Sequence, residues 1–221
     1  VIDSVDQANA RLDTRVQLIV SVNRHESPAL AEEVARLAVE RIPRGIVALN
    51  LAGNEADFPA DAFVSVFRDA RADGLAVTIH AGEWAGAVNV RQAIEEFQAE
   101  RIGHGIRVLE DADVVSLARE RGIVFEVCIT SNYHTGVTPS LTRHPVNQMF
   151  AAGLKVALNT DDPGVSGITL SDEYRLACET LSVPRWRLKQ SILDAVEASF
   201  LPPAEKAALL SRFKEELDWK T

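Results

Sequence analysis

The sequence has little cysteine, no long apolar run and no block of basic residues. Its two cysteines, Cys128 and Cys178, form no CxxC pair and are too few for a disulfide framework. Two buried thiols in a reducing compartment are therefore expected. No apolar run approaches the roughly 18 residues that a membrane-spanning helix needs, and no secretory pattern is visible. We expect a cytoplasmic protein with no membrane partner.

Clustered positive charge is also absent. The chain carries 23 Lys and Arg against 32 Asp and Glu, which gives a formal net charge of −9. A nucleic-acid surface needs clustered cations that displace counterions from the phosphates, so we expect no nucleic-acid partner. Small neutral or cationic ligands fit this charge balance better.

What the sequence does have is an alternation of short β-branched runs and helical patterns. The 221 residues, 47% of them apolar, suffice for one compact domain spanning 1–221. Six runs read as strands buried on both faces: Val16–Val22, Gly45–Leu51, Leu75–His80, Arg101–His104, Ile123–Cys128 and Leu154–Asn159. The alternation indicates a parallel α/β sheet, either doubly wound or a (β/α)₈ barrel. No GxGxxG or GxxxxGK[ST] motif follows a strand, which disfavours the doubly wound sheet.

Several helix boundaries are also visible. Ser27 before Pro28 is typical of a helix N-terminus, and Gly74 follows the last residues of another helical pattern. The segment Leu170–Thr221 is helical in pattern, with one helix expected to start after Pro202 and Pro203. These C-terminal helices are expected to flank the sheet.

Polar residues of a restricted kind stand where the expected strands end. They are Gly53–Glu55, His80 and Glu83, His104, Ser131 and Asn132, and Asp161 and Asp162. Each has an ordinary structural explanation: a lone histidine often satisfies a hydrogen bond, TDDP caps a helix, and GHG forms a tight turn. In a barrel, however, the carboxyl ends of the strands meet on one face. Their conjunction there indicates a site.

Imidazole and carboxylate donors on one rim indicate a divalent metal, and they suit zinc. His80 and Asp161 are the expected ligands. Glu83, beyond a turn at Gly82, is placed to act on the substrate as general acid or base. His104 is placed to orient or deprotonate the metal-bound water. Catalytic zinc normally takes three or more protein ligands, and only two are evident in the sequence.

Six motifs, spread along the chain, resemble the adenosine deaminase family. They are LAGNE (51–55), TIHAGE (78–83), ERIGHG (100–105), CITSNYHTG (128–136), HPVNQMFAAGLKVALNTDDP (144–163) and ASFLPPAEK (198–206). The resemblance implies a (β/α)₈ TIM barrel of the amidohydrolase type with one Zn²⁺ per subunit. It also implies hydrolytic deamination of adenosine or 2′-deoxyadenosine to inosine or 2′-deoxyinosine and ammonia, a reaction of purine salvage.

The resemblance also implies roles for single residues. His80 and Asp161 resemble zinc ligands, and Asp161 also bonds the hydroxide. Glu83 resembles the acid that protonates purine N1, and His104 resembles the base facing the zinc-bound hydroxide.

Two further residues resemble groups that contact the purine ring. Asp162 faces N7 in this interpretation, and the backbone amide of Gly53 meets N3. The acid role of Glu83 matters because, without protonation of N1, attack at C6 would place negative charge on an unassisted ring nitrogen.

The chain departs from the family pattern at several places. The family's first strand carries a His-x-His pair that supplies two zinc ligands, and no HxH occurs here. Six strands are counted where the barrel needs eight. We therefore expect the first two strands to be absent from this chain and supplied by an N-terminal segment or a second copy. Asn54, where the family usually has Asp, and the bulky Trp84 leave the substrate open.

Several alternatives remain beside this interpretation. The substrate could be free adenine or a modified adenine nucleoside, or the chain could be a non-catalytic barrel fragment or binding protein. Two-metal amidohydrolases need a carboxylated Lys on the strand that here ends NLAG and holds no Lys. The cytidine deaminase fold is excluded because it needs H-x-E and PCxxC motifs.

Overall fold

The computed structural model describes residues 1–217, so the last four residues of the expected domain and C-terminal helical segment lie outside the described part. Its centre is a six-stranded, fully parallel sheet. The strands are β1 Leu18–Asn23, β2 Ile46–Ala52, β3 Ala76–Ala81, β4 Arg101–His104, β5 Val124–Val127 and β6 Lys155–Leu158. All six predicted strands are confirmed, with only small shifts at their ends. The predicted burial on both faces is wrong for β1, which lies at an edge of the sheet and is partly exposed along most of its length.

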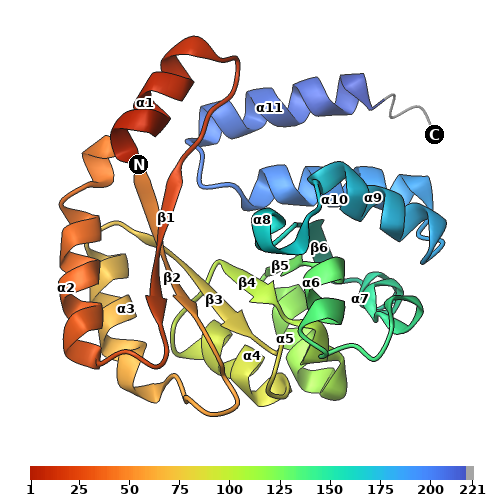
Figure 1. Cartoon of the computed structure of the whole chain (residues 1–221), viewed down its shortest axis with the longest axis horizontal. Coiled ribbons are helices and arrows are strands. Elements are labelled where there is room, and N and C mark those ends of the chain that lie inside the picture. Colours follow the sequence, from red (N-terminus) through yellow and green to blue (C-terminus); the bar gives the residue numbers. More distant parts are fainter. Residues whose placement is uncertain (218–221) are drawn as a thin grey trace.

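The strands follow one another in chain order across the sheet, β1-β2-β3-β4-β5-β6. A doubly wound sheet would instead reverse its order at a switch point. The sequential order and the helices that follow the strands on the outside are those of a barrel, as Figure 1 shows. Within residues 1–217, β1 and β6 each pair with one strand only. The array is therefore open between these two edges.

Helices connect successive strands, and others precede β1 or follow β6. The longer ones are α1 Ile2–Arg11, α2 Pro28–Val39, α3 Val64–Ala72, α4 Ala87–Glu95, α5 Ala112–Glu120, α9 Leu170–Glu179, α10 Arg185–Ala198 and α11 Pro203–Glu216. The short ones are α6 Ile129–His134, α7 Val146–Ala151 and α8 Pro163–Ser166. The predicted N-cap at Ser27 is confirmed, because its side chain accepts a hydrogen bond from the amide of Leu30 at 3.2 Å. In the described part, no helix combines the length and apolarity needed to cross a membrane.

The core lies between the sheet and the surrounding helices. The central strands are almost fully buried because each is covered on both faces, as Val77 and Ile102 illustrate with 0% exposure. Phe67 of α3 meets Phe97 edge to face, with ring centroids 5.5 Å apart. This packing fixes the strands, and the strands fix the loops that follow them.

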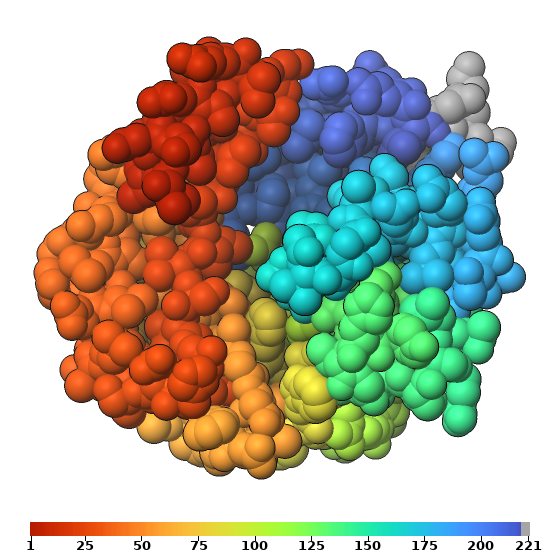
Figure 2. Space-filling view, in the orientation of Figure 1, coloured from red at the N-terminus to blue at the C-terminus, as the bar shows by residue number. Residues whose placement is uncertain are grey.

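The loops after the strands converge on one face of the molecule. Figure 2 shows that this face is hollowed at its centre, between the N-terminal segment and the segment around α8. Residues far apart in sequence therefore border one opening, as expected for the carboxyl ends of parallel strands.

Candidate active site

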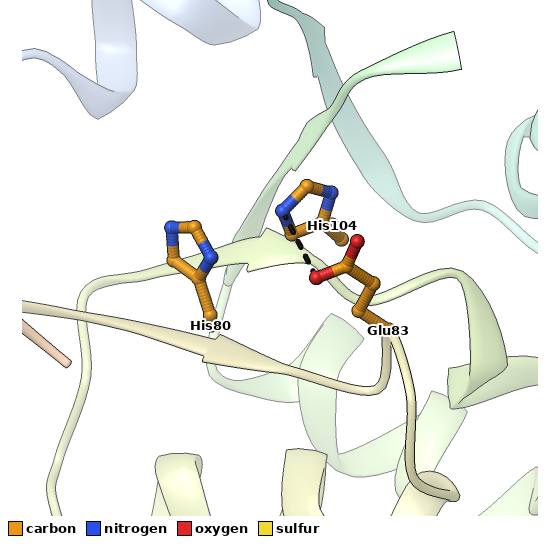
Figure 3. A group of neighbouring side chains, drawn as sticks. All are labelled: His80, Glu83 and His104. Atoms are coloured by element: carbon orange, nitrogen blue, oxygen red, sulfur yellow. Dashed lines mark ion pairs between the residues drawn. The ribbon is translucent and has the colours of Figure 1, made fainter. Parts of the chain in front are cut away.

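Strand β3 and the loop that follows it carry the first two candidate residues. His80 lies next to the end of the strand, and Glu83 follows a turn in which Gly82 has φ 73°. The side chain of Glu83 is buried, at 9% exposure. The turn directs Glu83 back toward His80, as the close-up in Figure 3 shows.

His104 ends the neighbouring strand β4. The parallel register pairs His80 with Gly103 and Ala81 with His104. A Cβ on Gly103 would lie 2.6 Å from His80 Cδ2, so only glycine leaves room for the imidazole there. The two imidazole rings then lie edge to face, with centroids 4.8 Å apart.

The three side chains form one compact group. One ligand atom from each of His80, Glu83 and His104 lies within 4.8 Å of the others. His104 Nε2 lies 3.4 Å from Glu83 Oε2, which is the dashed contact of Figure 3. The same nitrogen lies 3.9 Å from Asp161 Oδ2. His104 therefore faces two carboxylates, one from the loop after β3 and one from the loop after β6.

Asp161 reaches the group from the loop after β6. Its backbone has φ 58°, and its Oδ2 accepts a hydrogen bond from Ser131 Oγ at 2.7 Å. A cavity of about 220 Å³ is bordered by His80, His104 and Asp161 together with Glu126 and Cys128 among other residues. The two predicted zinc ligands, His80 and Asp161, thus share one cavity.

The remaining two predicted site residues lie at the rim. Asp162 caps α8, since its Oδ1 accepts a hydrogen bond from the amide of Val165 at 3.1 Å. Gly53 follows β2 with φ 100°, and a Cβ there would lie 2.3 Å from Asn23 Oδ1. Among the described residues, neither Gly53 nor Asp162 borders the cavity shared by His80 and Asp161.

Burial controls the charge state of the group. Desolvation, and after it the charges of Asp161 and Glu55, raises the pKa of Glu83 to about 7. Desolvation and then the neighbouring His80 lower the pKa of His104 to about 3. Desolvation also lowers the pKa of His80. Both imidazoles are therefore neutral at pH 7, while Glu83 is present in both its protonated and its ionised form.

A zinc ion fits this donor set. Neutral imidazole nitrogens and carboxylate oxygens are its usual ligands in catalytic sites, and here they converge in a largely buried group. The most compact group contains Glu83 and His104 beside His80, and Asp161 Oδ2 lies 3.9 Å from the same Nε2 atom of His104 that Glu83 faces. Two histidines and two carboxylates are thus within reach of one centre.

A buried carboxylate that had no assigned role in the sequence holds the loop carrying Glu83. Glu55, 4% exposed, accepts hydrogen bonds from the four successive amides of residues 82–85 at 2.6–3.0 Å. Asn89 Nδ2 adds a fifth bond at 3.1 Å. The only sequence signal was an acidic residue at a strand end, in LAGNE. Its function as a loop clamp depends on contacts across the fold.

We expect Glu55→Gln to lower the free energy of unfolding by about 3 kcal/mol, because a donor NH₂ would face buried amides. The displaced loop would also lower kcat by about tenfold or more, since small misplacements of a reacting group are costly. Urea unfolding and steady-state kinetics measure both effects. Asp57→Asn, an exposed change in the same segment, is the control, and equal behaviour of the two variants would contradict the clamp.

A second buried carboxylate, Glu173, holds the start of α6 by accepting hydrogen bonds from its first residues. Glu173 of α9 is 0% exposed and accepts a hydrogen bond from the amide of Ile129 at 2.8 Å. It also accepts bonds from the amide and hydroxyl of Thr130. Glu173 thereby fixes the start of α6, which carries Ser131 and Asn132 toward the site. Sequence reasoning missed this residue because it lies in a plain helical pattern.

Comparisons with known proteins agree with this geometry. The family model described as adenosine deaminase matches residues 1–216. The adenosine deaminase of Edwardsiella ictaluri is 40% identical over 212 residues, which is 95% of this chain and 62% of that protein. The adenosine deaminase of Vibrio parahaemolyticus is 41% identical over 172 residues, 78% of this chain and 52% of that protein.

Solved structures share the fold. An adenine deaminase from Arthrobacter aurescens superimposes with a TM-score of 0.91 at 28% identity, covering 98% of this chain and 66% of that one. An amidohydrolase from Burkholderia ambifaria with bound zinc gives a TM-score of 0.92 at 27% identity, covering 99% and 61%. An N6-mAMP deaminase from Arabidopsis gives 0.81 at 29% identity, covering 91% and 59%.

The chain spans about 60% of the length of the first curated relatives that it matches. The match nevertheless runs through nearly all the described residues, including every candidate site residue. The predicted resemblance and the α/β barrel class are both confirmed. By its sequence and its fold, the chain belongs to the adenosine deaminase family.

Proposed function

We propose that the protein is a zinc-dependent hydrolase that converts adenosine and 2′-deoxyadenosine to inosine and 2′-deoxyinosine, releasing ammonia. The observation that carries this proposal is the group of His80, Glu83 and His104, which Asp161 faces at the same strand ends. The adenosine deaminases at 40% and 41% identity support the reaction class and the nucleoside substrate.

Zinc would be held by His80 and Asp161, which border one cavity. When bound, the ion lowers the pKa of a water so that it is nucleophilic at neutral pH. The Nε2 atom of His104 lies near both carboxylates and would orient the nucleophile, and Ser131 Oγ donates a hydrogen bond to Asp161 Oδ2. The chain itself supplies the position of each group through the ends of β3, β4 and β6.

Glu83 is the proposed acid at purine N1. Attack at C6 raises the electron density on N1, so a proton delivered there stabilises the transition state. A carboxyl group whose pKa is about 7 is protonated in a substantial fraction of molecules at neutral pH and still gives up its proton readily. Burial provides this property, and the Glu55 clamp holds the group in place.

Asp162 and Gly53 are the proposed contacts to the rest of the purine ring, at N7 and N3 respectively. Both lie at the carboxyl ends of strands, on the same face as the His80 group. The bond that Asp162 makes to α8 uses one carboxylate oxygen, Oδ1. Its second oxygen is the one assigned to the substrate in this proposal.

We further propose that polypeptide from outside these 221 residues completes the barrel. The unpaired edges of β1 and β6 support this within the described part of the chain, because exposed parallel edges are rarely tolerated. An N-terminal segment of the same gene product or a second copy would fill the gap and bring the remaining zinc ligands. We place the protein in the cytoplasm, in keeping with its two free cysteines, Cys128 and Cys178.

Free adenine is the second candidate substrate, and a modified adenine nucleoside is a third. The adenine deaminase from Arthrobacter aurescens favours the former, and the N6-mAMP deaminase from Arabidopsis shows that related folds take a methylated substrate. All three react at C6 of the purine. Adenine lacks the sugar at N9, whereas the methylated substrate carries a methyl group on its 6-amino nitrogen.

Steady-state assays of the complete protein on adenosine, 2′-deoxyadenosine, adenine and N6-methyladenosine test the proposal. We expect the highest kcat/KM for the two unmodified nucleosides, with ammonia released in equal amount to the deaminated purine. A preference for adenine would overturn the nucleoside assignment. Absence of turnover with all four would overturn the deaminase proposal and favour a binding function.

A further inference from the structure

A chain of hydrogen bonds runs from the backbone to the buried side of His104. The amide of Val146, at the start of α7, lies 3.2 Å from His144 Nδ1. His144 Nε2 lies 3.1 Å from Asn132 Oδ1, and Asn132 Nδ2 lies 3.1 Å from His104 Nδ1. The exposed fractions of Asn132, His104 and His144 are 0%, 2% and 5%. Water therefore has little access to these groups and does not compete for their hydrogen bonds.

The backbone fixes the direction of this chain. An amide N–H can only donate, so His144 Nδ1 has to accept, and the proton of a neutral His144 lies on Nε2. That Nε2–H donates to the carbonyl oxygen of Asn132. The amide nitrogen of Asn132 then donates to His104 Nδ1, which has to be unprotonated. Burial lowers the pKa of His144 to about 4, in agreement with a neutral ring.

The opposite direction leaves donors facing donors. If the amide of Asn132 were turned over, its nitrogen would face His144 Nε2 and require the proton on Nδ1. That proton would then point at the N–H of Val146 across 3.2 Å. A buried polar group without a partner costs about 1–3 kcal/mol, so a single direction prevails.

We propose that His144 and Asn132 are positioning residues that keep the proton of neutral His104 on Nε2. This is the nitrogen that lies 3.4 Å from Glu83 Oε2 and 3.9 Å from Asp161 Oδ2. His104 thus presents a hydrogen-bond donor to the site and has no lone pair there to accept a proton. The assignment of the His104 tautomer depends only on the hydrogen-bond geometry, whereas its consequence for catalysis rests on the proposed deamination.

The consequence changes the role that the family resemblance implies for His104. As a neutral Nε2–H tautomer, it stabilises negative charge on the attacking oxygen by donating a hydrogen bond. The proton that the attacking water gives up passes to Asp161, the other carboxylate near His104 Nε2, because Glu83 is the protonated acid at N1. His104 keeps its own proton. His104 is then a donor that orients the nucleophile, which is one of the two roles that the sequence left open, and not the base that the family resemblance implies.

Nitrogen-15 NMR of the complete, metal-free protein reads the tautomer directly. With ¹⁵N-labelled histidine, we expect His104 to show a pyrrole-like shift at Nε2 and a pyridine-like shift at Nδ1 near pH 7. His104→Gln identifies the signal by its loss. The reverse pattern at His104 would overturn the proposal, whether or not the protein deaminates adenosine.

Asn132→Asp tests whether this chain of hydrogen bonds, called the relay below, sets the tautomer of His104. A carboxylate only accepts, so it takes a bond from His144 and draws the His104 proton to Nδ1. We expect the two ¹⁵N shifts of His104 to exchange character and kcat for adenosine to fall about 10²–10⁴-fold, with KM changed less than about threefold, as befits a histidine in the wrong tautomer. His134→Gln, an exposed change on α6, is the control and leaves the pattern unchanged.

His144→Leu covers the case in which Asn132→Asp does not fold. Without its anchor, the amide of Asn132 turns freely, and the His104 shifts move toward an average of the two tautomers. Unchanged shifts in either variant would overturn the relay. A reversed tautomer with unchanged kcat would overturn its catalytic consequence, and the expected shifts in a protein without deaminase activity would remove the proposed function while sparing the relay.

Discussion

Glu83→Gln is expected to lower kcat for adenosine by about 10²–10⁴-fold while the protein still binds zinc and purine, since it removes the proton donor and keeps the shape. Glutamine fills the same space after the Gly82 turn and still accepts or donates hydrogen bonds, but it has no proton to give to N1. Rapid-quench or steady-state assays with adenosine, together with zinc content and inosine binding, measure the three quantities.

Glu95→Gln is the matched control, because Glu95 is a half-exposed carboxylate paired with Arg91 on α4, away from the site. It is expected to leave kcat unchanged. Deamination by Glu83→Gln at the parent rate would exclude Glu83 as the acid, and the role of proton donor would have to pass to another group.

The same substitution has an independent effect on stability. Because the pKa of Glu83 rises from 4.5 to about 7 on folding, ionised Glu83 destabilises the folded chain. This cost is absent below pH 4.5, grows as the pH rises to 7 and then levels off at about 3 kcal/mol. Urea unfolding of the metal-free protein at pH 4 and pH 8 measures it: Glu83→Gln is expected to gain stability at pH 8 only. An equal gain at both values would contradict the raised pKa.

Asp161→Ala is expected to weaken zinc binding by about 10²-fold or more and to abolish turnover with it. The loss of a metal ligand exceeds the 10–100-fold effect that is typical of a residue supporting one. Competition with a chelator of known affinity measures binding, and the same samples give the rate of inosine formation. Ser131 would also lose its partner at 2.7 Å, which adds a smaller structural effect.

Asp162→Ala separates ligation from loop structure. It removes the cap of α8 and costs about 1 kcal/mol of stability, but it leaves the carboxylate of Asp161 in place. Zinc binding by Asp162→Ala is therefore expected to stay close to that of the parent. Full zinc occupancy in Asp161→Ala would remove Asp161 from the ligand set and leave the group of His80, Glu83 and His104 to hold the metal.

The strands could be predicted because burial on both faces demands runs of apolar, often β-branched residues. The segment predicted as Ile123–Cys128 forms β5 over Val124–Val127, and Leu154–Asn159 forms β6 over Lys155–Leu158. The ends differ because a ladder stops where the neighbouring strand departs, which the sequence of one strand does not encode. Arg101–His104 was predicted with its observed bounds.

The core of the site could be predicted for a similar reason. His80 and His104 interrupt apolar strands at their carboxyl ends, where a parallel array gathers its functional groups. The residues that hold them could not be predicted. Glu55 lies 27 residues from the nearest amide it binds, and Glu173 lies 44 residues from Ile129. Such long-range bonds depend on how close the chain brings two loops, which no local pattern records.

Asp162 illustrates how one residue supports two explanations. TDDP is a good helix-capping sequence, and the cap is present. The same aspartate stands beside Asp161, at the strand end where a substrate contact is proposed. Local chemistry explains the conformation of the loop, whereas the contact to N7 depends on a ligand and stays a prediction.

Zinc titration of the metal-free complete protein, with adenosine turnover followed in the same samples, tests whether the His80 group is the centre of a metal-dependent deaminase. We expect inosine formation to rise in proportion to added zinc and to level off at about one equivalent per chain, and Asp161→Ala to show neither the tight binding nor the rise. Undiminished turnover in chelator-treated protein would contradict the proposed site. So would turnover that keeps rising well beyond one equivalent of zinc per chain.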